Sequence, residues 1–167
     1  DLTFADVPPF SRVSGVFNFD ERGIRFNNLA GGFLGGQARF DATTRADGAT
    51  AITATGIATT EGLKRAVDVG VVQRVLDRSQ GRARHTASLT AHGGDLAIQA
   101  DSDLVGLTID GIAPLRKGAG EALPLRVEKT SRTGQDDLRV TAGRLVGLHL
   151  ERRRDGVARR APDRRVL

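Results

Sequence analysis

Four glycines surround a Phe-Leu pair at residues 30–36, where the sequence is AGGFLGG. A glycine-rich loop binds phosphate when a Lys-Ser/Thr pair follows its last glycine and the loop leads into a helix. Here Gly36 is followed by QARF, whose alternation predicts a strand instead. The stretch is therefore predicted to be a hairpin joint or a bulge, in which glycine permits positive φ or close approach of two backbones.

A second candidate, DSDLVG at residues 101–106, has the opening of a calcium loop. It offers carboxylates at the first and third positions and glycine at the sixth. Val105 at the fifth position and Ile112 at the twelfth cannot supply the oxygen ligands that such a loop needs. The two acids are predicted to lie on the solvent side of a strand.

The three histidines suggest no catalytic or metal site. His85 and His92 are seven residues apart on one predicted strand, which places them on opposite faces. His149 stands alone, no G-x-S-x-G elbow occurs, and the lack of cysteine excludes thiolate zinc sites. The sequence therefore predicts no enzyme, no metal and no cofactor.

The net charge of +5 is confined to one end of the chain. Residues 152–167 contain seven Arg and two Asp, and no aromatic residue that could stack on a base. We therefore expect no nucleic-acid binding, and we expect residues 154–167 to form a solvated or disordered tail.

No stretch approaches the roughly 18 apolar residues of a membrane span. Because the sequence contains no methionine, we expect a piece of a longer protein, with any membrane anchor outside it.

Period-two alternation of apolar and polar residues dominates the chain and predicts antiparallel strands joined by hairpins. Turns are expected at Asp20–Gly23, Asp47-Gly48 and Gly93-Gly94. The alternation breaks at about residues 60–79, which are predicted to form one or two short helices bent near Gly70.

This helical insert has its own signals. Thr60 is the predicted N-cap, and Leu63, Val67 and Val71 are expected to share one helical face. The predicted fold class is mainly β: a long, curved, antiparallel meander sheet forming an open apolar groove, with a short helical insert.

The predicted strands carry Arg, Asp, Gln and Thr on one face and small or aliphatic residues on the other. A single sheet of this kind leaves its apolar face open as a ligand groove or an interface. Ordinary core packing, or packing of the helices on the sheet, is the alternative role of the same side chains. The candidate groove-lining residues are Phe17, Phe19, Ile24, Phe26, Phe40, Ile52, Leu89, Leu96, Ile98, Leu104, Leu138 and Val140.

Three segments resemble the AsmA-like proteins of the YhdP type from Gram-negative bacteria. They are FDERGIRFNNLAGGFLGGQARFDATTRADGATAITATGIAT, SDLVGLTIDGIAPLRKGAGEALPLRVE and GRLVGLHLERR, and the resemblance covers roughly residues 12–153. Its motifs are structural rather than catalytic. After Arg153 the family-like alternation is lost.

The resemblance implies a bridge-like lipid transporter with a repeating β-groove. Such a protein is anchored in the inner membrane, spans the periplasm and carries phospholipid between the inner and outer membranes. Residues 1–153 would then be one β-groove segment, with phospholipid acyl chains and neighbouring groove units of the same longer chain as its partners. The alternative function is that of a structural or assembly β-module of the cell envelope without lipid cargo, whose sheet edges pair with neighbouring units.

Overall fold

The computed structural model describes residues 11–16, 18–21, 23–67, 69–111, 116–144 and 146–153. Strands take up 64% of these residues, and the helical insert consists of two short helices. The mainly β prediction is therefore confirmed. The predicted tail at residues 154–167 and the candidate residue Phe17 lie outside the described part of the chain.

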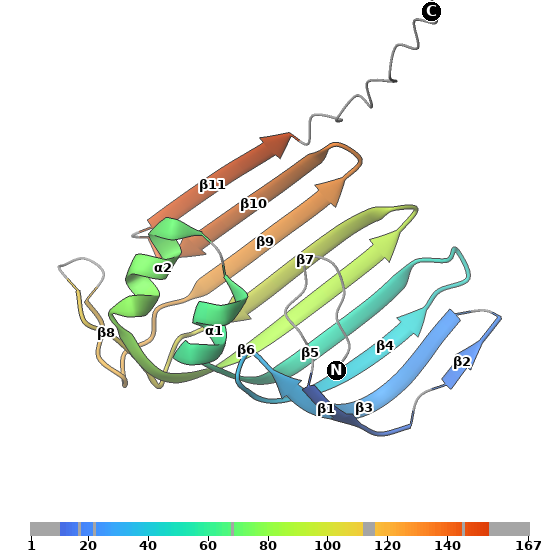
Figure 1. The fold of residues 1–167 in the computed structure, drawn as a ribbon, viewed down its shortest axis with the longest axis horizontal. Helices are drawn as coiled ribbons and strands as arrows, with labels where there is room; N and C mark the ends of the chain where they lie inside the picture. Colours follow the sequence, from blue (N-terminus) through green and yellow to red (C-terminus); the bar gives the residue numbers. More distant parts are fainter. Residues whose placement is uncertain are drawn as a thin grey trace, which may run out of the picture.

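The strands form one open, antiparallel, twisted sheet, whose ribbon is shown in Figure 1. Its order is β1-β3-β4-β5-β6-β7-β9-β10-β11, so strands that are consecutive along this path pair with each other, as in a meander. Two short strands lie off this path, because β2 pairs with β3 and β8 pairs with the first residues of β6. The bounds are β1 (Ser11–Ser14), β2 (Asn18–Asp20), β3 (Gly23–Phe33), β4 (Gly36–Thr44), β5 (Thr50–Thr59), β6 (Ser79–His92), β7 (Asp95–Ser102), β8 (Leu107–Ile109), β9 (Leu125–Arg132), β10 (Gln135–Ala142) and β11 (Val146–Arg153).

All three predicted turns occur where the alternation placed them. Asp20 pairs with Gly23 across the β2–β3 turn, and the β4–β5 loop contains Asp47-Gly48. Gly93 and Gly94 join β6 to β7 with φ of 58° and 91°. Two successive positive φ values are what a tight two-residue hairpin requires, and glycine adopts them at the lowest cost.

The AGGFLGG stretch is a strand joint, as predicted. β3 runs through its first glycines to Phe33, the chain turns at Leu34-Gly35, and β4 begins at Gly36. Leu34 and Gly35 have φ of 49° and 80°. A Cβ on Gly36 would lie 2.1 Å from the carbonyl oxygen of Ile57, so this glycine permits close approach of the neighbouring strand.

The helical insert consists of α1 (Thr60–Ala66) and α2 (Gly70–Asp77), which confirms the break near Gly70. The predicted N-cap was wrong by one residue. Thr59 caps α1, because its side-chain oxygen accepts a hydrogen bond of 3.1 Å from the backbone N–H of Gly62. Thr60 is fully buried instead, and its hydroxyl donates to a carbonyl of β6.

The two helices pack on one end of the strands, next to the β3–β4 turn (Figure 1). The side-chain amide of Gln73 in α2 donates to the carbonyl of Lys64 in α1 at 2.9 Å, which ties the helices together. Val71 is 53% exposed, whereas Leu63 and Val67 are half-buried, so the prediction that the three share one helical face was wrong for Val71. Because α1 ends at Ala66 and α2 begins at Gly70, helical periodicity does not carry over from one helix to the next.

The core has two parts. The first lies under β3, β4 and β5, and the second lies at the helix end of the sheet. Their buried members are Phe26, Leu29, Phe33, Ala38, Phe40, Ala42 and Ala54 in the first part, and Ala83, Leu104, Leu107 and Ile109 in the second.

Candidate functional site

Strand pairing gathers most of the candidate lining residues on one face of the sheet. Directly paired residues in antiparallel strands point to the same side. From β3 to β11, one row of such pairs is Phe26, Ala42, Ile52, Leu89, Ile98, Lys129, Leu138 and Leu150. The next row is Leu29, Phe40, Ala54, Ala87, Ala100, Val127, Val140 and Leu148.

We call this side the apolar face. Nine candidates lie on it: Ile24, Phe26, Phe40, Ile52, Leu89, Leu96, Ile98, Leu138 and Val140. The backbone of Phe19 pairs with Ile24.

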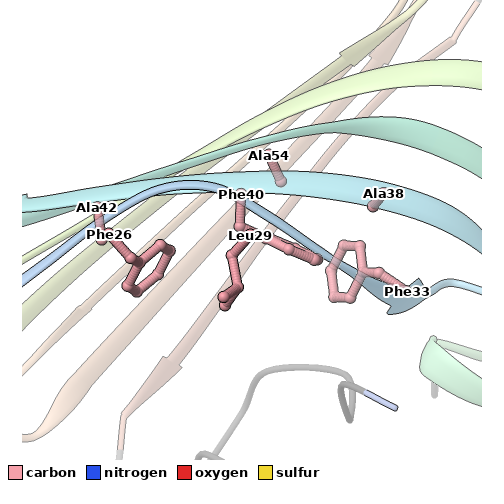
Figure 2. Packing of buried hydrophobic residues seen from close by; sticks show 7 residues of the cluster. All are labelled: Phe26, Leu29, Phe33, Ala38, Phe40, Ala42 and Ala54. Atoms are coloured by element: carbon pink, nitrogen blue, oxygen red, sulfur yellow. The ribbon is translucent and has the colours of Figure 1, made fainter. Parts of the chain in front are cut away.

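Burial along the apolar face changes from one end of the sheet to the other. Figure 2 shows Phe26, Leu29, Phe33 and Phe40 projecting together from β3 and β4. The rings of Phe33 and Phe40 meet edge to face, with centroids 5.8 Å apart and an interplanar angle of 83°.

On β6, Ala83 and His85 near the helices are buried, whereas Ala87 and Leu89 are half-buried. From β7 to β11 the aliphatic side chains of the two rows are half-buried, and Leu150 is 41% exposed. The two rows are thus closed core near β3 and an open surface from β6 to β11.

A bulge in β3 keeps two large side chains on this face. The register shifts between Phe26 and Leu29, and Asn28 has φ of 55°. The backbone N–H of Asn28 donates to the carboxylate of Asp41 at 2.8 Å. At the bulge, β3 has one residue more than the paired stretch of β4. Phe26 and Leu29, which are three residues apart, therefore face the same side of the sheet. Period-two counting from Phe26 therefore missed Leu29.

Leu104 does not lie with the other candidates. β7 ends at Ser102, and Leu104 follows in a loop with φ of 55°. There it packs with Ala83 and Leu107 in the cluster beneath the helices. Leu104 is therefore not on the apolar face with the other candidates: the chain leaves β7 at Ser102, whose hydroxyl oxygen accepts a hydrogen bond of 3.0 Å from the backbone N–H of Leu104.

His85 is a polar side chain buried on the apolar face. It pairs with Gly56 of β5, is 7% exposed, and its ring lies 5.8 Å from that of Phe33. Neither ring nitrogen has a hydrogen-bond partner. Burial lowers the pKa of His85, because desolvation disfavours the imidazolium form. His92, on the same strand, is exposed and donates from Nε2 to the carbonyl of Asp47, so the prediction of opposite faces is confirmed.

Two shallow hollows, of about 640 Å³ and about 500 Å³, are lined mostly by residues of the opposite, polar face, and the larger one also reaches His85 and Leu125. Threonines and ion-pairing residues line them, among them Asp101 and Arg126 in the larger hollow and Asp137 and Arg139 in the smaller. The apolar face is an open surface rather than an enclosed cavity. The candidate site is therefore the surface formed by the two rows, in which Lys129 is the one polar side chain.

The acids of DSDLVG are used structurally. Two hydrogen bonds to its carboxylate lower the pKa of Asp101: the larger effect comes from Gln99 and the next from Arg126, whose Nε donates at 2.7 Å. Asp103 accepts from the backbone N–H of Val105 at 3.0 Å, which forms a turn. Both carboxylates thus accept hydrogen bonds from other groups of the chain.

One cross-strand cluster was missed because its members are distant in sequence. On the polar face, His149 Nε2 lies 2.5 Å from an oxygen of Asp137 and 3.7 Å from one of Glu151. These three groups could together hold a cation. His149 and Glu151 are exposed, however, and exposed acidic groups of this kind are common without a metal.

Among the described helices, neither is long and apolar enough to cross a membrane.

The described part of the chain thus has the fold class of an open antiparallel meander sheet with one largely apolar face. The chain belongs to the YhdP protein family, whose model matches residues 2–162. This membership indicates an envelope protein of the lipid-transport type, in a family of transport and structural proteins. Searches of curated proteins and of solved structures each gave no match.

Proposed function

We propose that the apolar face is a passage for phospholipid acyl chains within a periplasm-spanning protein that carries phospholipid between the inner and outer membranes. The single observation that supports this most is the length of the two rows, which run across eight paired strands from β3 to β11 and are apolar except at Lys129. Membership of the YhdP family agrees with this function. An anchor in the inner membrane would come from a segment outside this sequence.

The mechanism is passive. Each CH₂ group that leaves water for an apolar surface gains about 0.8 kcal/mol. Along the row that contains Ala54, Ala87 and Ala100, the side chains are small and aliphatic and offer no hydrogen bond that would hold a chain in place. An acyl chain can therefore remain bound while it slides from strand to strand, and no residue of the face needs to react.

Photo-crosslinking tests this function in the full protein. A photoreactive residue at Ile98, which is half-buried on the apolar face, should give phospholipid adducts. The same residue at Ala97, which is exposed on the polar face, is the matched control and should give few. Equal yields at both positions, or no adduct at position 98, would reject the passage.

An Ile98→Asp variant provides a second test. We expect it to fold, since Ile98 is only half-buried, and to fail in supplying lipid to the outer membrane, because a charge on the path costs several kcal/mol to desolvate. Full lipid supply by the folded variant would show that the path does not cross β7.

A structural or assembly module is the second candidate function. The described part of β11 pairs only with β10, so its outer edge is free to add another strand. An assembly module would keep its full function with Ile98→Asp but lose it when edge pairing is blocked, for example by His149→Pro in β11.

A further inference from the structure

Polar side chains interrupt the apolar face at one margin of β9, β10 and β11. Lys129 lies directly between Ile98 and Leu138 in the first apolar row. The next row lies closer to the hairpin turn at Gly134. In it, Leu96 pairs with Ser131, Ser131 with Asp136, and Asp136 with Arg152. We call Lys129, Ser131, Asp136 and Arg152 the polar margin.

The polar margin faces the same side as the apolar rows, not the opposite polar face. This follows from the unbroken pairing of Ser131 with Leu96 and of Lys129 with Ile98. The other margin of these strands, next to the helices, differs in chemistry, since it presents Leu125, Ala142 and Val146. The face is therefore amphipathic across its width, polar on the hairpin side and apolar on the helix side.

The hydroxyl of Ser131 provides an independent observation. Its oxygen is buried and has no hydrogen-bond partner. A buried hydroxyl without a partner costs free energy, so such a group is usually satisfied by a ligand or a water. Lys129 and Asp136 already interact with other groups of the chain, and a ligand here would exchange contacts with them.

We propose that Lys129, Ser131 and Arg152 bind the phosphodiester of a phospholipid headgroup, while the acyl chains of the same lipid lie over the apolar rows. This inference rests on the proposed function and adds the orientation of the lipid across the face. Two cations and the Asp136 carboxylate leave one positive charge, which complements the single negative charge of a phosphodiester. Lys and Arg form charge-assisted hydrogen bonds with phosphate oxygens, and the serine hydroxyl can donate a further one.

The spacing on the sheet suits an amphiphile. Val127 lies on the same face as Lys129, two residues away along β9, which is about 7 Å. A headgroup at Lys129 therefore places the first methylene groups over Val127 and its neighbours Val140 and Ala100. The reverse orientation would leave a charged phosphate over aliphatic side chains, which is costly.

Lipid selectivity tests the polar margin. The full protein is incubated with vesicles that contain equal amounts of phosphatidylglycerol, phosphatidylethanolamine and diacylglycerol, then repurified, and its bound lipids are measured by native mass spectrometry. The wild type should retain both phospholipids in preference to diacylglycerol, which has similar chains but no phosphate. The Lys129→Gln/Arg152→Gln variant should lower this preference by roughly fivefold.

The matched control is Arg132→Gln/Arg153→Gln. It removes two positive charges from the same two strands, but both residues lie on the opposite face, since each pairs with Gln135. This control should retain the wild-type preference. Circular dichroism and the melting temperature of each variant show that the sheet is intact.

Each other result contradicts the proposal in a distinct way. If the Lys129→Gln/Arg152→Gln variant binds lipids with unchanged preference, headgroups do not contact the polar margin, although the passage itself stands. If the control loses the preference equally, the selectivity arises from net charge alone. If the wild type binds no lipid of any kind, the proposed function fails, and the orientation of the lipid fails with it.

Discussion

At the scale of single residues, the least expected feature is a buried imidazole without a hydrogen-bond partner. His85 lies against Phe33, and its register neighbour Gly56 offers no side chain that could pair with it. Burying a polar group without a partner costs about 1–3 kcal/mol. Burial therefore disfavours the charged form of His85 in the folded protein.

This leads to a pH-dependent stability. The pKa of His85 in the folded state is lowered from 6.5, so the unfolded chain binds a proton in a pH range where the folded chain does not. Stability is therefore lost as the pH falls through the unfolded-state value of 6.5 toward the lower folded-state value. Urea unfolding at about pH 7.5 and about pH 5 should show this loss in the wild type and a smaller loss in His85→Leu.

The control for this prediction is His92→Gln, because His92 is exposed on the same strand. That variant should keep the wild-type pH dependence. If His85→Leu and the wild type lose stability equally, other groups control the acid sensitivity of the sheet.

At the scale of elements, the helical insert is attached through a close backbone contact. Gly62 of α1 lies against the β3–β4 turn, where an added Cβ would come within 1.9 Å of the Leu34 carbonyl oxygen. Thr59 donates its backbone N–H to the same carbonyl at 2.9 Å. The turn and the first turn of α1 therefore form one unit, which positions the helices at the end of the sheet.

Two glycine-to-alanine variants should act in opposite directions. Gly62→Ala forces backbone atoms apart and should destabilise the protein by about 2–4 kcal/mol. Gly70→Ala begins α2 with a better helix former and meets nothing within 4 Å, so it should be neutral or stabilising by up to about 1 kcal/mol. Thermal unfolding of both variants measures the difference. Equal melting temperatures would show that α1 is not tightly packed on the turn.

At the scale of the whole molecule, stability should follow the gradient of burial across the sheet. The buried aromatic cluster lies on β3 and β4, whereas the aliphatic side chains of the two rows are half-buried or exposed from β6 to β11. The buried residues of β6 and β8 belong to the second part of the core, at the helix end of the sheet. Regions with few buried contacts open more often than the core. The open part of the apolar face should therefore unfold locally more often than the part on β3 and β4.

Amide hydrogen exchange can measure this gradient. Protection should be highest in β4 and β5, which are central strands on the buried cluster, and lowest in β11, which is an edge strand. We expect exchange in β11 to be at least about tenfold faster than in β4. Uniform protection from β3 to β11 would mean that the sheet opens as one unit.

The sequence by itself determined the class of fold and most of the apolar face. Alternation in strands such as 36–44 and 95–102 places aliphatic residues on one side, and glycine and aspartate pairs mark the turns, because both signals depend only on local backbone geometry. Pairing then aligned these alternating strands as expected. Whether the face carries lipid stays a prediction.

Only the tertiary structure decided where the alternation fails and what lies side by side. The bulge at Asn28 depends on a hydrogen bond to Asp41 of the next strand, which brought Leu29 onto the apolar face. The end of β7 at Ser102 moved Leu104 beneath the helices. The polar margin joins residues of three strands through their register, and register is a long-range property that no single segment of the sequence contains.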